Sequence, residues 1–181
     1  MREAGSFAGG EGEAFAVVSR GDFVTGLLLR CSARGPHPLV LITPALGSDK
    51  HARTIATLCR ALCQEGLCAA AIDLPLQGAR ASAKLSDRLV RCATQRQRTE
   101  SDRLLWDEFL RQSALDLAAT CAALARRPEI RSERIGCVAF EPGAEAAAAW
   151  AAREARLRTC LAVAPDADPE RIARQLREQL A

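Results

Sequence analysis

The chain has 181 residues, about the size of one compact domain, and 49% of them are hydrophobic while 26% are charged. This composition supports a globular core and excludes wholesale disorder and collagen-like sequence. The net charge is only +3 and no dense basic region occurs, so we expect no nucleic-acid partner. No apolar run is long enough to cross a bilayer, and the first residues lack the apolar stretch of a secretory signal, so we expect a cytoplasmic protein that does not bind membranes.

The chain begins with a segment, residues 1–13, that is rich in Gly and Glu and has no periodicity. We expect this segment to be a flexible tail and residues 14–181 to form a single domain. Two β-type runs follow, at 14–19 and 24–31, and a Gly-Asp turn signal separates them. This pattern predicts an antiparallel hairpin.

The next stretch predicts a strand, a helix and a second strand. Residues 39–42 form a short apolar run bounded by turn residues, which is typical of a strand buried on both faces. Ser48 or Asp49 is expected to cap a helix that ends at Gly66, and residues 67–72 predict the second buried strand. A helical crossover between neighbouring strands makes them parallel.

Residues 74–103 look irregular, and residues 84–103 carry six basic and three acidic side chains. We expect a solvated loop here, with a cap over a pocket as the alternative, and a weak preference for anionic ligands. The rest of the chain predicts a helix from Leu105 to about Pro128, a strand at 135–140, a helix at 144–155, a strand at 159–164 and a helix at 168–181.

Together these elements predict an α/β fold, with a mostly parallel sheet, an N-terminal antiparallel hairpin and helices on both faces in a three-layer sandwich. Such sheets bind ligands beyond the carboxyl ends of their strands. We therefore expect any site to lie on the loops that follow residues 42, 72, 140 and 164.

The chain has eight cysteines, none of them in a C-x-x-C pair, and their neighbours are mostly apolar. We expect them to act as small hydrophobic core residues. Cys59 and Cys63 are one helical turn apart, but only His37 and His51 are available to complete a tetrahedral site. We therefore expect no metal and no cofactor.

Three stretches carry a family resemblance. Residues 39–47 read LVLITPALG, residues 71–80 read AIDLPLQGAR, and residues 134–144 read RIGCVAFEPGA. They resemble, in turn, the strand and oxyanion loop, the D-x-P-x-H-G-x-R stretch and the strand before the nucleophile elbow of the α/β-hydrolase superfamily, particularly its esterase and dienelactone-hydrolase-like branch. Thr43-Pro44 replaces the usual His-Gly pair, and Gln77 stands where His is common.

This resemblance extends over about residues 14–165 and implies a site at the elbow. It gives Glu141 the position of the nucleophile, and the oxyanion and substrate-pocket candidates are Ala45, Leu46, Gln77 and Pro142.

The elbow departs from the family motif G-x-S-x-G, because residues 139–143 read Ala-Phe-Glu-Pro-Gly. Glu141 replaces the attacking Ser or Cys. Pro142 has no backbone N–H, so the oxyanion donor expected from the residue after the nucleophile is chemically absent. Loss of one such donor costs on the order of 10²–10³ in rate.

The family order is nucleophile, acid, then His. Because only a helix is predicted after residue 164, we expect the chain to be truncated before the acid and the His. His37 is expected in a surface loop, and His51 in a capping or solvent-facing role.

Glu141 itself has two interpretations. Haloalkane dehalogenases and epoxide hydrolases, which this case resembles, use an elbow Asp to form an ester intermediate. Glu is longer by one methylene, so we expect Glu141 to be a partly exposed carboxylate near a helix N-terminus, with nucleophilic attack as the alternative.

The resulting interpretation is a catalytically degenerate α/β-hydrolase-like protein that acts as a binding or interaction module. The alternative is an esterase-type hydrolase of a small acyl ester, with Glu141 at the elbow or with the missing acid and His supplied by a partner chain. Expected partners are a small-molecule ligand, and a second copy or partner chain at the sheet edge formed by residues 159–164. A decayed gene product is a third hypothesis.

Overall fold

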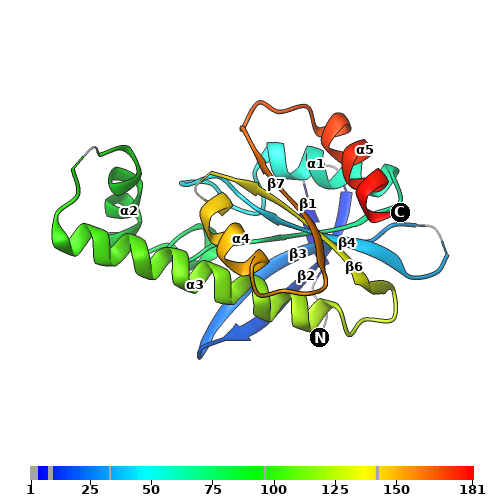
Figure 1. Ribbon diagram of the computed structural model, residues 1–181, viewed down its shortest axis with the longest axis horizontal. Helices are drawn as coiled ribbons and strands as arrows, with labels where there is room; N and C mark the ends of the chain where they lie inside the picture. Colours follow the sequence, from blue (N-terminus) through cyan, green and yellow to red (C-terminus); the bar gives the residue numbers. More distant parts are fainter. Residues whose placement is uncertain (1–3, 8–9, 33, 96, 142) are drawn as a thin grey trace.

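The computed structural model describes residues 4–7, 10–32, 34–95, 97–141 and 143–181 (Figure 1). This part of the chain forms one seven-stranded sheet in the order β1-β2-β3-β5-β4-β6-β7. The strands are β1 (Ala4–Phe7), β2 (Gly10–Ser19), β3 (Asp22–Leu29), β4 (His37–Thr43), β5 (Cys68–Ile72), β6 (Ile130–Phe140) and β7 (Leu157–Val163). Five of the seven point the same way, because only β1 and β3 run against the others. The predicted α/β class and the N-terminal hairpin are confirmed.

Helices cover both faces of the sheet. They are α1 (Arg53–Gln64), the short 3-10 helix η1 (Gly78–Arg80), α2 (Leu85–Thr94), α3 (Glu100–Leu124), α4 (Gly143–Ala151) and α5 (Pro169–Leu180). Figure 1 shows α1 and α5 together on one side, α3 and α4 on the other, and α2 with the first turns of α3 extending past the sheet. Within the described ranges, no helix is long and apolar enough to cross a membrane.

The alternation of side chains along the buried strands explains the three layers. In β4, Leu39 and Leu41 belong to the core cluster beneath α3 and α4, while Val40 and Ile42 belong to the cluster beneath α1 and α5. Successive residues of a strand point to opposite faces, so a continuous apolar run is needed where both faces are covered. The sequence interpretation of residues 39–42 is thereby confirmed.

The N-terminal segment differs from its prediction as a flexible tail. β1 pairs antiparallel with the first residues of β2, with Ala4 opposite Glu13 and Phe7 opposite Gly10. Main-chain hydrogen bonds along a sheet edge do not need the apolar alternation that marks a buried strand. This Gly- and Glu-rich segment therefore pairs as a strand without a periodic sequence signal.

Residues 74–103 also differ from their prediction as an irregular loop. They contain α2, whose buried Leu89 and Cys92 are three residues apart on one helical face. They also contain the start of α3, which begins at Glu100 rather than at Leu105. The Thr99 side chain accepts from the Asp102 N–H, and Asp102 accepts from the Thr99 N–H in return, so a capping box fixes this earlier start.

Helix α1 begins later than its sequence suggests. Its N-cap is Ala52, which makes no side-chain cap, rather than Ser48 or Asp49. Residues 44–52 instead form a loop, and the backbone N–H of Lys50 is used in a hydrogen bond to Asp73 at 3.0 Å. This long-range bond holds the chain out of the helix at the position where local capping preference predicted its start.

Candidate functional site

The carboxyl ends of β4, β5, β6 and β7 lie at one edge of the sheet, because these four strands run parallel. In Figure 1 this edge points toward α2. The sequence-predicted residues Ala45, Leu46, Gln77 and Glu141 all lie on loops that leave the sheet here. Pro142 lies outside the described residues. This edge is where open α/β sheets bind ligands.

The segment around the elbow forms a strand, a turn and a helix, as the family resemblance implies. β6 ends at Phe140, Glu141 lies in the turn, and α4 begins at Gly143. Gly143 is buried against Thr43 at the end of β4, and a Cβ at position 143 would collide with the Thr43 hydroxyl. The close packing of β4 against the start of α4 therefore requires a residue without a side chain there.

Glu141 is exposed, and its carboxylate makes no hydrogen bond or ion pair with another described residue. Among the described non-glycine residues, left-handed backbone angles occur at Arg20 and Leu76, so Glu141 lacks this strained conformation. Its carbonyl oxygen accepts a hydrogen bond from the Leu46 N–H at 3.3 Å. This bond occupies the Leu46 N–H. The family resemblance places the backbone groups of Ala45 and Leu46 at the oxyanion hole.

Gln77 fastens the loop after β5 to the loop after β4. With its amide nitrogen facing two carbonyls, it donates to the backbone oxygens of Ala45 and Ser48, each at 3.1 Å. The side chain is almost completely buried. Gln77 therefore holds the shape of the 44–52 loop.

Asp73 and Lys50 form a buried ion pair close to Gln77 in the same pair of loops. The Lys50 ammonium donates to Asp73 Oδ2 at 2.5 Å, and the side chains are 9% and 0% exposed. The backbone N–H of Ala79 and the hydroxyl of Thr25 also donate to Oδ2, at 3.0 and 3.1 Å. Burial raises the pKa of Asp73, but the hydrogen bonds from Lys50 and Ala79 outweigh it and hold the pKa below its usual value.

Arg80 extends this network to the helix layer. Its guanidinium donates to Asp116 of α3 at 2.6 Å, to Asp22 at the start of β3 at 2.8 Å and to the Asp73 carbonyl at 3.2 Å. Asp116 is fully buried and also accepts from Gln112 at 2.7 Å. The D-x-P-x-Q-G-x-R pattern in the sequence thus marks two charged residues that brace the loops.

The sequence reasoning did not identify Lys50, Asp73, Arg80 or Asp116 as parts of the site. The D-x-P motif contained a signal for Asp73 and Arg80, since both are motif positions. Nothing local marks Lys50 or Asp116, because their partners are 23 and 36 residues away along the chain.

Among the described residues, a broad hollow of about 740 Å³ lies between the end of β7 and α5, and two smaller clefts open near the carboxyl edge. The first, of about 210 Å³, lies between the loops after β4 and β5 and helix α2. The second, of about 280 Å³, lies between the first turn of α1, Phe140 and α5. Glu141 lines neither of these two clefts, so the elbow carboxylate is separate from both.

The two histidines do not complete a catalytic pair with Glu141. His37 is the first residue of β4, at the opposite end of the strand from Thr43, roughly 20 Å away along an extended chain. It is half-buried within a strand rather than in the predicted surface loop. His51 is exposed on the loop before α1, where its backbone N–H donates to Asp49. Within the described residues, no group of three or more His, Cys, Asp or Glu side chains is arranged to hold a metal.

No protein-family model and no curated protein matches the sequence. Solved structures do match its fold. A cold-adapted esterase from an Arctic intertidal metagenomic library superimposes with a TM-score of 0.64 at 19% identity, over 84% of this chain and 59% of that one. A dienelactone hydrolase from Anabaena variabilis gives 0.61 at 19% identity, over 83% and 62%.

A putative dienelactone hydrolase from Klebsiella pneumoniae gives a TM-score of 0.60 at 22% identity, over 82% of this chain and 57% of that one. The chain thus spans about three fifths of the length of these proteins. Esterases and dienelactone hydrolases belong to the α/β-hydrolase superfamily. The chain has the α/β-hydrolase fold.

Proposed function

We propose that this α/β-hydrolase-fold chain is a binding protein whose elbow does not support nucleophilic catalysis. The observation that carries the proposal is the hydrogen bond from the Leu46 N–H to the Glu141 carbonyl, which occupies a backbone donor at the oxyanion position. Position 142 is Pro and has no N–H to donate. An acyl-transfer transition state would therefore find Ala45 alone among the expected backbone donors.

The ligand site of this proposal is the 210 Å³ cleft between the two loops and α2. Its wall is mainly apolar, and the polar groups are hydroxyls, an amide and two carboxylates. The lining residues are Leu46, Gly47, Ser48, Asp49, Leu76, Gln77, Gly78, Ala81, Ser86, Asp87, Leu89 and Val90. A small molecule with an apolar body and a neutral or cationic polar end fits this lining.

The lining also changes the expectation of an anionic ligand. Among the described residues, no basic side chain lines the cleft. Arg88 pairs with Asp102 at 2.7 Å, and Arg98 stacks over the Trp106 ring at 4.2 Å while donating to the Cys92 carbonyl. These positive charges of the 84–103 segment serve the junction of α2 with α3. Helix α2 itself forms a wall of the cleft, which supports the alternative of a cap over a pocket.

Three probes with the same four-carbon body test the proposal at fixed pH: butanol, butylamine and butyrate. We expect butanol or butylamine to raise the thermal midpoint and butyrate not to, because a ligand that binds only the folded state stabilises it. Val90→Trp should abolish the increase by filling the cleft, since Val90 lines it and is 40% exposed. Leu104→Trp, at a 64% exposed position of α3 outside the lining, is the matched control. A midpoint that none of the probes moves, or an increase that survives Val90→Trp, would contradict the proposal.

A second candidate is an esterase-type hydrolase acting on a small acyl ester. The fold neighbours favour it more than they favour a binding role, because they are named esterase and dienelactone hydrolase. Glu141, exposed on the bend between β6 and α4, would be its attacking or base group. The discriminating assay is turnover of p-nitrophenyl butyrate. Hydrolysis that disappears in Glu141→Gln would establish this candidate, whereas the binding proposal expects no turnover above buffer.

An assembly through the sheet edge is a separate part of the proposal. β7 is the last strand in the sheet order and pairs with β6 alone among the described strands. An open edge offers unpaired backbone groups to a second copy or another chain, which could also supply catalytic groups. Light scattering on the purified protein tests this, and a strictly monomeric species would remove the second copy as partner.

A further inference from the structure

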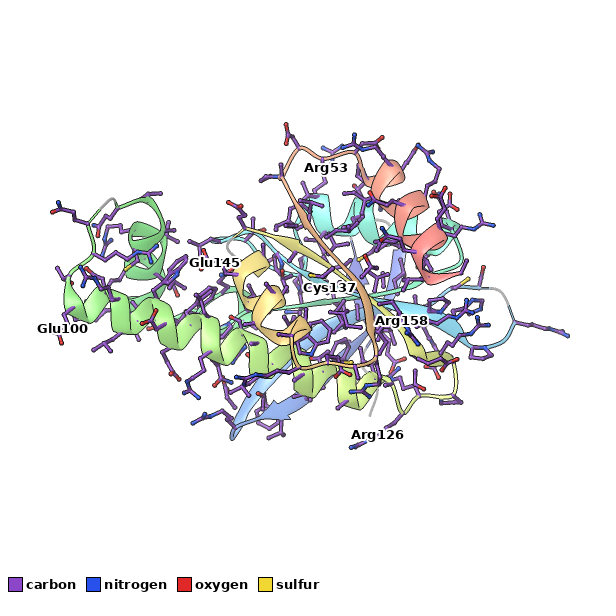
Figure 2. The ribbon with its side chains drawn as sticks, in the orientation of Figure 1. Arg53, Glu100, Arg126, Cys137, Glu145 and Arg158 are labelled. Atoms are coloured by element: carbon purple, nitrogen blue, oxygen red, sulfur yellow. The ribbon has the colours of Figure 1, made fainter. Side chains whose placement is uncertain are left out.

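Two cysteines face each other at the open side of the sheet. Cys137 of β6 and Cys160 of β7 are direct partners in the parallel register, so their side chains lie on the same face. Figure 2 labels Cys137 in the middle of the sheet and Arg158, two residues before Cys160, on the adjacent strand. The two sulfurs are near enough for the Cys137 thiol to influence the ionisation of Cys160.

The spacing of these strands suits a covalent bond between the two sulfurs. Neighbouring strands lie about 4.7–4.9 Å apart, and disulfides join residues whose Cα atoms are about 4.4–6.8 Å apart. Both residues are free cysteines in this structure. A disulfide requires the two side chains to rotate and their Cβ atoms to come within about 3.5–4.5 Å of each other.

The two thiols differ in their access to solvent. Cys137 is completely buried in the core cluster beneath α3 and α4. Cys160 is exposed, because exposed and half-buried residues alternate along β7 and its Cys160 face is the open one. A third cysteine, Cys121 of α3, lies near Cys137 but is fully buried. Within this group, only Cys160 meets a dissolved oxidant directly.

The neighbouring Cys137 thiol also favours the reactive form of Cys160. It lowers the pKa of Cys160, against the opposing effect of partial burial, because a donor stabilises the thiolate. The thiolate is the form of cysteine that reacts with oxidants. The buried partner keeps its proton until the second step.

We propose that Cys160 is a peroxide-reactive modification site and that Cys137 resolves it as an intramolecular disulfide. In the first step the Cys160 thiolate attacks one oxygen of hydrogen peroxide, the O–O bond breaks, and sulfenic acid and hydroxide form; the hydroxide takes up a proton to give water. In the second step the Cys137 sulfur attacks the Cys160 sulfur and displaces hydroxide, which leaves as water with the Cys137 proton. Two thiols and one peroxide thus give one disulfide and two waters.

Peptide mapping after peroxide treatment tests this proposal. Trypsin releases residues 135–153 and 159–171, each containing a single cysteine, so the disulfide appears as one linked peptide pair that dithiothreitol separates. We expect this pair to be the main product at low peroxide, with a loss of two hydrogen atoms in the intact mass. Labelling with dimedone should be faster at Cys160 than at Cys31, a half-buried cysteine outside this group.

Two variants separate attack from resolution. Cys137→Ala should leave Cys160 as a sulfenic acid that dimedone traps, whereas Cys160→Ser should remove the linked pair without exposing Cys137. Cys31→Ser is the control and should leave the linked pair unchanged. The proposal is overturned if the 135–153 and 159–171 peptides stay unlinked in the folded wild type, or if Cys160 reacts no faster than Cys31. Circular dichroism of Cys160→Ser, a surface change, shows that a lost link does not reflect unfolding.

Discussion

The carboxyl edge has two halves that are built in opposite ways: the loops after β4 and β5, here the loop half, and the turn after β6, here the elbow half. The loops after β4 and β5 carry a buried network in which Lys50, Asp73 and Arg80 all have charged partners. The turn after β6 carries Glu141, an exposed carboxylate whose side chain makes no contact of this kind with the described residues. Catalytic groups in enzymes are held by packing and hydrogen bonds around them. The comparison therefore shows that charged partners fix the loops after β4 and β5, whereas the Glu141 carboxylate has no such partner among the described residues.

The largest effect is expected for Asp73→Ala. It leaves the Lys50 ammonium buried without its partner, and such losses destabilise proteins by about 3–5 kcal/mol. Asp22→Ala, which removes the 63% exposed partner of Arg80, is the control and should cost about 1 kcal/mol or less. Urea unfolding of both variants measures the difference. Equal losses would show that the buried pair is not the brace of the loop half.

Gly143→Ala tests the packing beneath the elbow. The new Cβ would collide with the Thr43 hydroxyl, so we expect a loss of about 1–3 kcal/mol in the free energy of unfolding. Thr43→Ala in the same chain should recover part of this loss, because it removes the colliding atom. A double-mutant cycle from denaturant unfolding measures the coupling. No coupling would contradict the contact between β4 and the start of α4.

Acid should reduce the contribution of Asp73, in the loop half, to the free energy of unfolding. The pKa of Asp73 is lower in the folded chain than in the unfolded chain, so its stabilising effect is present above the unfolded value, about 3.9. That effect is lost as the pH falls through the folded value. The difference in unfolding free energy between wild type and Asp73→Asn should therefore be larger at pH 7 than at pH 3. A difference that does not shrink would show that the charge of Asp73 contributes nothing.

Glu141→Gln should have the smallest effect on stability. Glu141 is exposed, and surface substitutions away from specific contacts usually change stability by less than about 0.5 kcal/mol. The same thermal and urea measurements check this. A loss of unfolding free energy comparable with that of Asp73→Ala would mean that the Glu141 carboxylate makes stabilising contacts in the folded protein.

The sequence predicted much of the fold because the buried strands have strong local signals. The apolar run at β4, the hairpin turn and the Asp168-Pro169 start of α5 were read correctly. The predictions were wrong where the signal was absent or misleading. β1 pairs with β2 although its sequence has no apolar periodicity, and the start of α1 is moved by the bond from Lys50 to Asp73.

The same contrast holds for the site. Glu141 on the bend after β6 was located from the motif, and Gln77 was placed at the correct edge. The role of Gln77 as a strap between two loops was not predicted. Seven of the eight cysteines are buried or half-buried, as expected, whereas Cys160 is exposed. The sequence did predict a sheet edge at residues 159–164, but the exposure of Cys160 follows from which face of β7 the helices leave uncovered, and neighbouring residues do not encode that.

By itself, the sequence determined most of the strands and helices, though not β1 or α2, and the absence of a backbone donor at position 142. Both follow from neighbouring residues, since periodicity sets the element and the covalent structure of Pro142 removes its N–H. The tertiary structure decided which distant groups meet: Lys50 with Asp73, Leu46 with Glu141, and Cys137 with Cys160. Such pairs depend on how strands align and loops cross at the sheet edge, and the residues on either side of each group in the chain do not encode that alignment.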